Sequence, residues 1–211
     1  MLTAGISTSS GQFTLIIGEN GKVLFDSSEH AGNNELDDSL RTGLEYCKRK
    51  INEITNIIVD TGPGGTSRVR TGIAFANSLS YGLGISVCPV SSMELAGIEA
   101  WSKYGVPVIN SVKSIKGNAY IGLYNKYKLI SIKYGEVHDI VPLMVKNINK
   151  FVVTGYCCEA IVNLPSIKDK IIIGSSMPYG NAKFLVEKES LFISRKLTFP
   201  EIALPITEKT L

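Results

Sequence analysis

The chain has 211 residues, 44% of them hydrophobic and 19% charged, and its formal net charge is +3 at pH 7. This balance excludes a disordered or low-complexity chain, because enough apolar surface is present to build a core. It gives no argument for a nucleic-acid-binding protein either, since the net charge is small and the basic residues are scattered. The length fits one large domain or two small ones.

The N-terminus and the cysteines indicate a cytoplasmic protein. The opening segment MLTAGISTSSGQ has no basic region followed by a long apolar one, so it does not predict a signal peptide. The four cysteines have no CxxC spacing, which favours reduced thiols. Residues Thr71 to Met93 carry no charge, but glycines and Pro89 interrupt them. We therefore expect a buried helix, a turn and a strand in that segment, and no contact with a membrane.

The first predicted elements are two strands and a tight hairpin. Leu2 to Thr8 and Gln12 to Gly18 are strand-like, and Asn20-Gly21 between FTLIIGE and KVLFDSS is a strong two-residue turn signal. The chain therefore opens as an antiparallel meander. A helix is expected over Asn34 to Lys50, because apolar residues recur at helical spacing and the charges match the helix dipole.

A glycine-rich turn follows the next strand. The strand NIIVD runs into GPGG, and Ser67 to Leu83 shows the apolar stripe of a helix. Gly62, Gly64 and Gly65 permit positive φ, so that backbone N–H groups can converge on an anion near a helix N-terminus. A phosphate site is one interpretation of this turn, and a plain strand-to-helix connection is the other. The spacing matches neither a P-loop nor a dinucleotide motif.

The second half of the chain repeats this order. ISVCPV is a predicted strand, Ser91-Ser92-Met93-Glu94 follows it with the spacing of a capping box, and the helix is expected to end near Trp101. VPVINSVKS and AYIGLYN predict a second hairpin, with KLISIKY as a further strand. Weaker signals predict a helix at VPLMVKNINK, strands at FVVTG and KIIIG, and a helix from Tyr179 to Ser190. We expect two ββαβα-like α/β subdomains, residues 1–105 and 106–211.

Taken together, these motifs resemble the TsaB (YeaZ) family. The resemblance is carried by GISTSSGQFTLII, by His30, by GPGGTSRVRTGIAFANSLSYG and by SVKSIKGNAYIGLY. It implies the fold of the actin-like ATPases, sugar kinases and Hsp70-type (ASKHA) proteins. The central motif of the family is GPGSFTGLRIG, and the residues that match it here are Gly62, Pro63, Gly64, Arg70 and Gly72.

The resemblance implies a subunit without activity of its own. TsaB proteins pair with a TsaD-type catalytic subunit, which a TsaE-type ATPase joins, for threonylcarbamoyl transfer to adenosine 37 of tRNA, the t6A modification. Without that partner, the same partner-binding surface is expected to self-associate, so that the chain alone forms a homodimer. Contact with tRNA is expected only through the complex. No cofactor of its own is expected, and binding of ATP or ADP at the partner interface is left open.

The implied partner interface lies on the two helices of the first subdomain. Gly72, Ala76 and Ser80 stand four residues apart, and small side chains let another backbone come close. Packing of this row against the protein's own sheet is the alternative. The residues expected at the interface are Leu36, Leu40, Leu44, Val69, Arg70, Gly72, Ile73, Ala76 and Ser80.

Catalytic groups are missing where this fold would use them. ATP-splitting relatives carry an acidic residue at the end of the first strand, where this chain has Ser7. His30 and His138 do not form the His-x-x-x-His metal pair of the catalytic paralogue. Asp60 is interpreted as a turn cap rather than a general base. No catalytic or metal-binding residue is therefore expected, and the candidates for a nucleotide or phosphate site are Ser7, Gly62, Gly64, Gly65 and Ser67.

Two other functions stay open as alternatives. A small kinase or ATPase of the same fold would use Ser7, Asp60 and the glycine-rich turn. A peptidase-like protein is the second alternative, but the sequence contains no GxSxG elbow and no HExxH motif.

Overall fold

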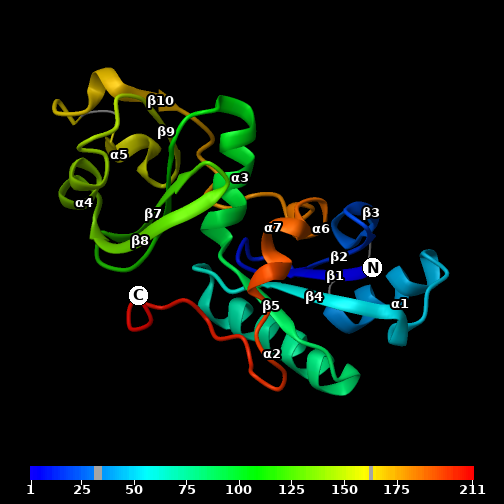
Figure 1. The fold of residues 1–211 in the computed structure, drawn as a ribbon. Coiled ribbons are helices and arrows are strands. Elements are labelled where there is room, and N and C mark those ends of the chain that lie inside the picture. The colour runs from blue at the N-terminus through cyan, green and yellow to red at the C-terminus, as the bar shows by residue number, and fades with distance from the viewer. Residues whose placement is uncertain (31–34, 162–163) are drawn as a thin grey trace. The chain divides into compact units, whose positions relative to one another are not determined.

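The same strand order is built twice along the chain, once in each of two units (Figure 1). The computed structural model describes residues 1–30, 35–161 and 164–211. The first unit comprises Met1–Ser92 and Ala182–Ile206, and the second comprises Met93–Asn181 and Thr207–Leu211. This division differs from the expected residues 1–105 and 106–211, because the chain leaves the first unit at Ser92 and returns to it at Ala182.

In the first unit, an antiparallel meander is extended by two parallel strands. Its strands are β1 (Leu2–Ser7), β2 (Thr14–Glu19), β3 (Lys22–Asp26), β4 (Ile54–Asp60) and β5 (Val87–Val90). They lie in the order β3-β2-β1-β4-β5, with β4 parallel to both β1 and β5. The turn between β2 and β3 is Asn20-Gly21, with φ of 52° and 78°, so the predicted hairpin is confirmed.

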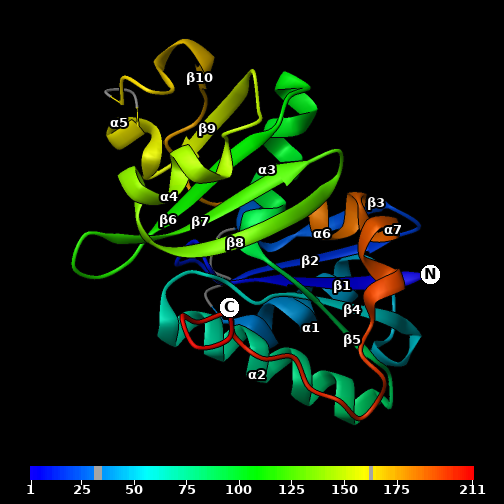
Figure 2. The ribbon, with the colours of Figure 1, turned by 60° about the vertical axis from the view of Figure 1, so that its left-hand side comes forward.

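Helices cover both faces of this sheet (Figures 1 and 2). The helices α1 (Leu36–Tyr46) and α2 (Thr66–Leu83) lie on one face, and the short α6 (Phe184–Glu187) and α7 (Glu189–Phe192) lie on the other. Asn34, where the first helix was expected to begin, lies outside the described residues. Short 3-10 helices complete the unit at Ser27–Glu29, Ile51–Glu53 and Ile193–Arg195.

Glycines in the central strands let α6 sit directly on the sheet. A Cβ atom on Gly5 would lie 2.9 Å from the Cβ of Leu185, and one on Gly18 would lie 2.2 Å from Cγ1 of Val186. Neither strand position therefore has room for a side chain while α6 stays in place. Leu185 and Val186 are fully buried as a result.

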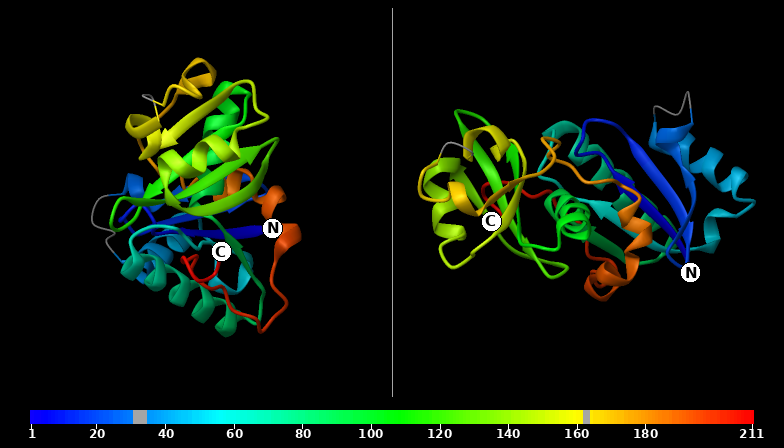
Figure 3. Two further views of the ribbon diagram at one scale, coloured as in Figure 1. Left: turned by 90° about the vertical axis from the view of Figure 1, so that its left-hand side faces the viewer. Right: turned by 90° about the horizontal axis from the view of Figure 1, so that it is seen from above.

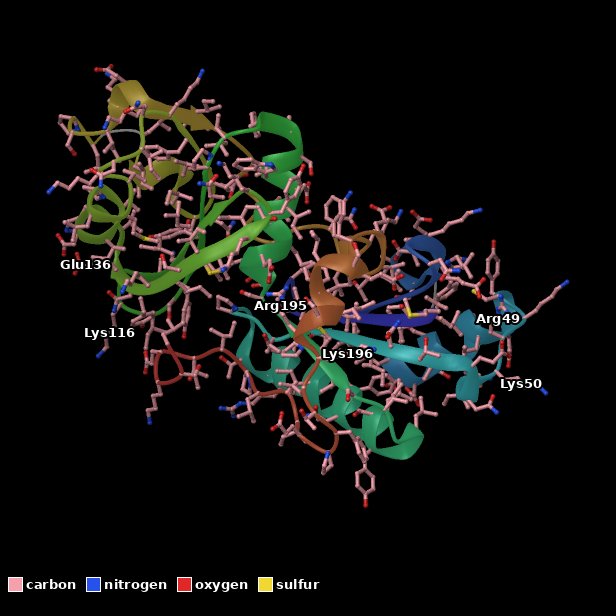
Figure 4. The ribbon with its side chains drawn as sticks, in the orientation of Figure 1. Arg49, Lys50, Lys116, Glu136, Arg195 and Lys196 are labelled. Carbon is pink, nitrogen blue, oxygen red and sulfur yellow. The ribbon has the colours of Figure 1, made fainter. Side chains whose placement is uncertain are left out.

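A series of hydrogen bonds between buried polar side chains also holds the returning segment, residues 182–206, in the first unit. The hydroxyl of Thr3 donates to the carboxylate of Glu189 in α7, and Asn56 Nδ2 donates to Thr3 Oγ1 at 3.1 Å. Lys196 Nζ, labelled in Figure 4, donates to Asn56 Oδ1. Glu189 is only 5% exposed, and a buried carboxylate needs such partners. Segments from the two ends of the chain are therefore joined by specific hydrogen bonds as well as by apolar packing.

The second unit repeats the arrangement (Figure 3). Its strands are β6 (Val108–Lys113), β7 (Asn118–Asn125), β8 (Lys128–Glu136), β9 (Phe151–Gly155) and β10 (Ile171–Ile173), in the order β10-β9-β6-β7-β8. Helices α4 (Val137–Met144) and α5 (Cys157–Ile161) lie on one face, and α3 (Ser92–Tyr104) lies on the other. A 3-10 helix spans Lys168–Lys170.

Some weaker signals gave different elements. The helix expected at VPLMVKNINK begins earlier, at Val137, and contains Pro142. Instead of one helix from Tyr179 to Ser190, the chain has α6 and α7, which are four residues each. The actin-like fold class is confirmed, because each unit has a meander extended by crossover helices and parallel strands. No helix among the described residues is both long and apolar enough to cross a membrane.

We predict that Leu185→Ala destabilises the protein by about 2–5 kcal/mol, because it empties a fully buried site against the sheet. Urea unfolding followed by circular dichroism measures the change. The matched control is Leu204→Ala in the same returning segment, where the side chain is 64% exposed. The control is expected to change stability by less than about 0.5 kcal/mol. Equal losses in both variants would contradict the anchoring role of α6.

Candidate functional site

The glycine turn, Thr61–Gly65, joins the end of β4 to the start of α2. Gly62 has φ of +89°, a conformation that glycine adopts without steric cost. Its carbonyl oxygen accepts hydrogen bonds from the N–H of Ser92 at 2.9 Å and from Oγ of Ser91 at 3.0 Å. Ser92 Oγ donates to the carbonyl oxygen of Pro63 at 2.7 Å. The residues that follow β5 therefore fix the direction of the turn.

Asp60 ties this turn to the two central strands. It is the last residue of β4, and it is 1% exposed. Its carboxylate accepts hydrogen bonds from Ser7 Oγ at 2.8 Å and from the N–H of Gly62 at 2.9 Å. Burial raises the pKa of the Asp60 carboxyl above its ordinary range, and these two hydrogen bonds oppose the rise. Asp60 thus acts as the turn cap that the sequence indicated.

Helix α2 packs very closely on the loop that follows β1. A Cβ atom on Gly72 would lie 2.6 Å from Thr8 Oγ1, and one on Gly64 would lie 2.7 Å from the Cα atom of Ser9. A larger residue at either position would push the helix away from the loop. The glycines of the GPGGTSRVRTG motif therefore set the distance between α2 and the sheet.

The five residues considered for a phosphate site are placed in two groups. Ser7 and the N–H of Gly62 meet, but they meet on the carboxylate of Asp60. Gly65 and Ser67 lie exposed at the start of α2, and Gly64 is half-buried between the two groups. The structure therefore brings Ser7 and Gly62 together around the carboxyl group of Asp60, which belongs to the chain itself.

The expected interface residues are, with one exception, buried within the first unit. Their side chains lie in the core of the first unit, because the apolar stripes of α1 and α2 pack on the unit's own sheet. Gly72 is buried against Thr8, and Ser80 donates to the carbonyl oxygen of Ile85 at 2.5 Å. Only Arg70 is exposed. The buried residues are Leu36, Leu40, Leu44, Val69, Gly72, Ile73, Ala76 and Ser80.

The exposed side of α2 carries small side chains in its middle, with Arg70 and Tyr81 as its large residues. This outer face consists of Ser67, Arg70, Thr71, Ala74, Ser78 and Tyr81. Tyr81 is 78% exposed. Along one flank of the helix runs the C-terminal segment (Figure 2), where the side chain of Asn77 exchanges two hydrogen bonds with the backbone of Ala203, at 3.1 and 2.9 Å. The sequence-based prediction missed this face because it placed the interface on the apolar stripe of the helix, and the outer face lies on the opposite side.

Comparison with known proteins identifies the family. The family model described as "TsaD: tRNA N6-adenosine threonylcarbamoyltransferase" matches residues 27–181, which is well over half of the chain. The chain belongs to this family. The tRNA threonylcarbamoyladenosine biosynthesis protein TsaB of Bacillus subtilis (strain 168) is 29% identical over 101 residues, 47% of this chain and 40% of that protein. The resemblance to the TsaB (YeaZ) family that the motifs indicated is confirmed.

Solved structures of YeaZ proteins share the fold. YeaZ from Pseudomonas aeruginosa has a TM-score of 0.77 at 18% identity, with 98% of this chain and 99% of that chain covered. A second structure from Pseudomonas aeruginosa, an uncharacterized protein with similarity to peptidase YEAZ, also has a TM-score of 0.77, at 17% identity and 98% coverage of both chains. The whole of the described fold, including the returning segment, is therefore a YeaZ fold.

The histidines of this TsaB-like chain lie in two different settings. His30 Nδ1 lies 2.9 Å from the carbonyl oxygen of Asp26, and its ring packs against aromatic neighbours. His138 Nε2 lies 3.1 Å from Glu136 Oε2 and 3.6 Å from Asp139 Oδ1, next to the end of β8 where Figure 4 labels Glu136. Among the described residues, this is the one group whose atoms are close enough to hold a metal ion. All three of its side chains are exposed, so we interpret it as a surface ion-pair group.

We predict that Asp60→Asn makes the protein's stability less dependent on pH. Because the pKa of Asp60 is raised on folding, its contribution to stability is complete below the ordinary value of about 3.9 and is lost as the pH rises through the folded-state pKa. The free energy of unfolding of the wild type, relative to Asp60→Asn, therefore falls as the pH rises from about 3 through the folded-state pKa of Asp60. Urea unfolding at several pH values measures this difference.

A second variant tests the hydrogen bond. Ser7→Ala removes a donor that lowers the pKa of Asp60, so the same loss of stability is expected to extend to higher pH. Parallel pH profiles for the wild type and Asp60→Asn would show that the pKa of Asp60 is not raised.

Proposed function

We propose that this chain is a non-catalytic TsaB-type subunit that pairs with a TsaD-type catalytic subunit for threonylcarbamoyl transfer to adenosine 37 of tRNA. Membership in the family supports a role of the chain in this reaction, and the name of the Bacillus subtilis relative refers to the same modification. The match to that relative covers 40% of its length. The proposed role places the protein in the cytoplasm, in a complex that a TsaE-type ATPase joins.

The outer face of α2 is the observation that carries the pairing. Its small side chains at positions 67, 71, 74 and 78 leave the helix backbone open to close approach by another helix. Each of the two helices also has an exposed aromatic ring: Tyr81 on α2 is 78% exposed, and Tyr46 on α1 is 64% exposed. In the absence of a TsaD-type subunit, we propose that two copies of the chain associate through this face.

Burial of Asp60 supports the absence of catalysis. A kinase or ATPase of this fold needs an accessible carboxylate to organise Mg²⁺ around the phosphates of ATP. Asp60 is the nearest carboxylate to the glycine turn, and both of its oxygens accept hydrogen bonds from within the chain. Turnover of Mg-ATP by the purified protein, abolished in Asp60→Asn, would support the kinase or ATPase alternative instead. A nucleotide at the partner interface would meet the exposed Gly65 and Ser67.

We predict that Ala74→Arg weakens the complex with the TsaD-type subunit of the same organism by more than about tenfold, equal to about 1.4 kcal/mol. A long charged side chain in the middle of the outer face blocks the close approach of a partner helix. Size-exclusion chromatography with light scattering on the mixed subunits measures the loss. Gly72→Arg is unsuitable for this test, because Gly72 lies against Thr8 inside the first unit.

The matched control is Ala160→Arg. Ala160 is also an exposed helical alanine, but it lies on α5 in the second unit. The control is expected to form the complex like the wild type. If the wild type forms no complex with the TsaD-type subunit, the proposed pairing is wrong. Equal weakening by both substitutions would move the interface away from the outer face of α2.

A further inference from the structure

Although the net charge of the whole chain is small, one long segment between Glu99 and Glu136 is strongly basic. Between Glu99 and Glu136 the sequence contains six lysines, at positions 103, 113, 116, 126, 128 and 133, and no aspartate or glutamate. All of these lysines belong to the second unit. The ion pairs formed among the described residues use none of them. Their positive charge is therefore not neutralised by neighbouring carboxylates.

The turn between β7 and β8 has a backbone that its residues do not favour. Lys126 has φ of 47° and Tyr127 has φ of 66°, and positive φ at both central residues is the requirement of a type I′ hairpin. This turn normally uses Asn-Gly, as the hairpin at Asn20-Gly21 does. A lysine and a tyrosine at these positions make the turn less favourable. An unfavourable turn of this kind points to a role for the two side chains beyond forming the turn.

Aromatic rings gather beside this turn. Tyr127 is 55% exposed, and its ring centroid lies 6.1 Å from that of Trp101, with the two ring planes at 61°. Trp101 belongs to the last part of α3, which lies next to the end of β7 in Figure 1. In the same part of α3, Lys103 Nζ lies 5.2 Å from the ring centroid of Tyr104. We call this group the aromatic–lysine cluster: Trp101, Lys103, Tyr104, Lys126, Tyr127 and Lys128.

The surroundings of the cluster favour an anionic ligand. The carboxylate that precedes it on α3, Glu99, accepts a hydrogen bond from the backbone N–H of Asn181 at 3.0 Å. Lys126 and Lys128 flank the exposed ring of Tyr127 on the hairpin, and both are exposed. Cations that flank an exposed ring are the combination that binds unpaired nucleic acid, because the ring stacks on a base and the cations neutralise its phosphates. A double helix hides its base faces, so it would use the lysines alone.

We propose that the aromatic–lysine cluster binds an unpaired segment of RNA, with Tyr127 stacking on a base and Lys126 and Lys128 contacting the flanking phosphates. This inference deepens the proposed function, because it assigns this chain a direct contact with the RNA substrate of the complex. It departs from the expectation that tRNA is contacted only through the partner. Recognition by stacking tolerates any base, so the site adds affinity and position rather than sequence specificity.

The test uses the full-length chain and a fluorescein-labelled oligouridylate of about 12 nucleotides, followed by fluorescence anisotropy. The wild type is expected to bind this probe more tightly than an RNA duplex of the same length or polyglutamate. Because two lysines contact phosphates, the logarithm of the affinity is expected to fall with the logarithm of the salt concentration with a slope of about −1.4. Equal binding of the duplex, or of polyglutamate, would overturn the proposal in favour of a purely electrostatic surface.

The decisive variant is Lys126→Asn/Tyr127→Gly, which converts the turn into Asn-Gly. We predict that RNA binding falls by about tenfold or more, from loss of one stacked base and one phosphate contact. The melting temperature is expected to stay the same or to rise, because Asn-Gly suits the positive φ values. Opposite changes in binding and stability separate a binding role from a structural one.

Lys116→Asn is the matched control. It removes one lysine and creates the same Asn-Gly pair, but in the β6–β7 turn, where Lys116 and Gly117 have φ of 55° and 81°. This control is expected to bind RNA within about twofold of the wild type. Equal loss of binding in the control and in the decisive variant would overturn the proposal, and so would the absence of RNA binding by the wild type.

Pairing with a TsaD-type subunit and RNA binding by the aromatic–lysine cluster can be tested independently of each other. The variant Lys126→Asn/Tyr127→Gly keeps the outer face of α2 intact, so it is expected to form the complex with the TsaD-type subunit. No RNA binding by a chain that still forms this complex overturns the cluster alone. RNA binding by a chain that forms no such complex overturns the pairing and leaves the cluster supported.

Discussion

A carboxylate that water does not reach holds the first unit together at the point where its functional elements meet. Asp60 accepts hydrogen bonds from the end of β1, through Ser7, and from the glycine turn, through the N–H of Gly62. The direction of that turn decides where α2 begins, and the missing side chain at Gly72 decides how closely α2 approaches the sheet. The exposed small-residue face of α2 therefore depends on a hydrogen-bonded group on the opposite side of the turn. Substitutions at Asp60 would therefore alter the surface that we propose for the partner without changing any residue on it.

Local periodicity explains which parts of the fold were predictable from the sequence. The meander strands are short apolar runs, α1 and α2 have helical spacing, and the turn Asn20-Gly21 has a specific backbone requirement. The C-terminal part lacks such signals, because its helices α6 and α7 are four residues each. Its place in the first unit is decided by contacts between distant residues, such as the hydrogen bond of Thr3 with Glu189, 186 positions away. A prediction made from short stretches of sequence cannot detect a contact between residues so far apart.

The candidate sites were harder to predict, for a related reason. An apolar stripe shows that one side of a helix is buried, but not whether a sheet of the same chain or another protein covers it. Val69 and Ile73 were assigned to a partner and lie in the core of the first unit. Net charge has the same weakness, since it sums over two units and hides the lysines that surround Tyr127. The resemblance to a family supplied the fold and the function class, whereas exposure and backbone conformation supplied the surfaces.

The path of the chain has a consequence for its synthesis on the ribosome. The first unit takes up Met1–Ser92 early, but the segment that covers one face of its sheet is residues 182–206, near the end of the chain. Until that segment leaves the ribosome, the sites that Leu185 and Val186 fill on β1 and β2 are open. The second unit can complete most of its sheet in the meantime, because its strands are contiguous in sequence. The nascent chain therefore exposes an apolar sheet face until residues 182–206 have been made, and in that period a chaperone or early collapse would protect it from aggregation.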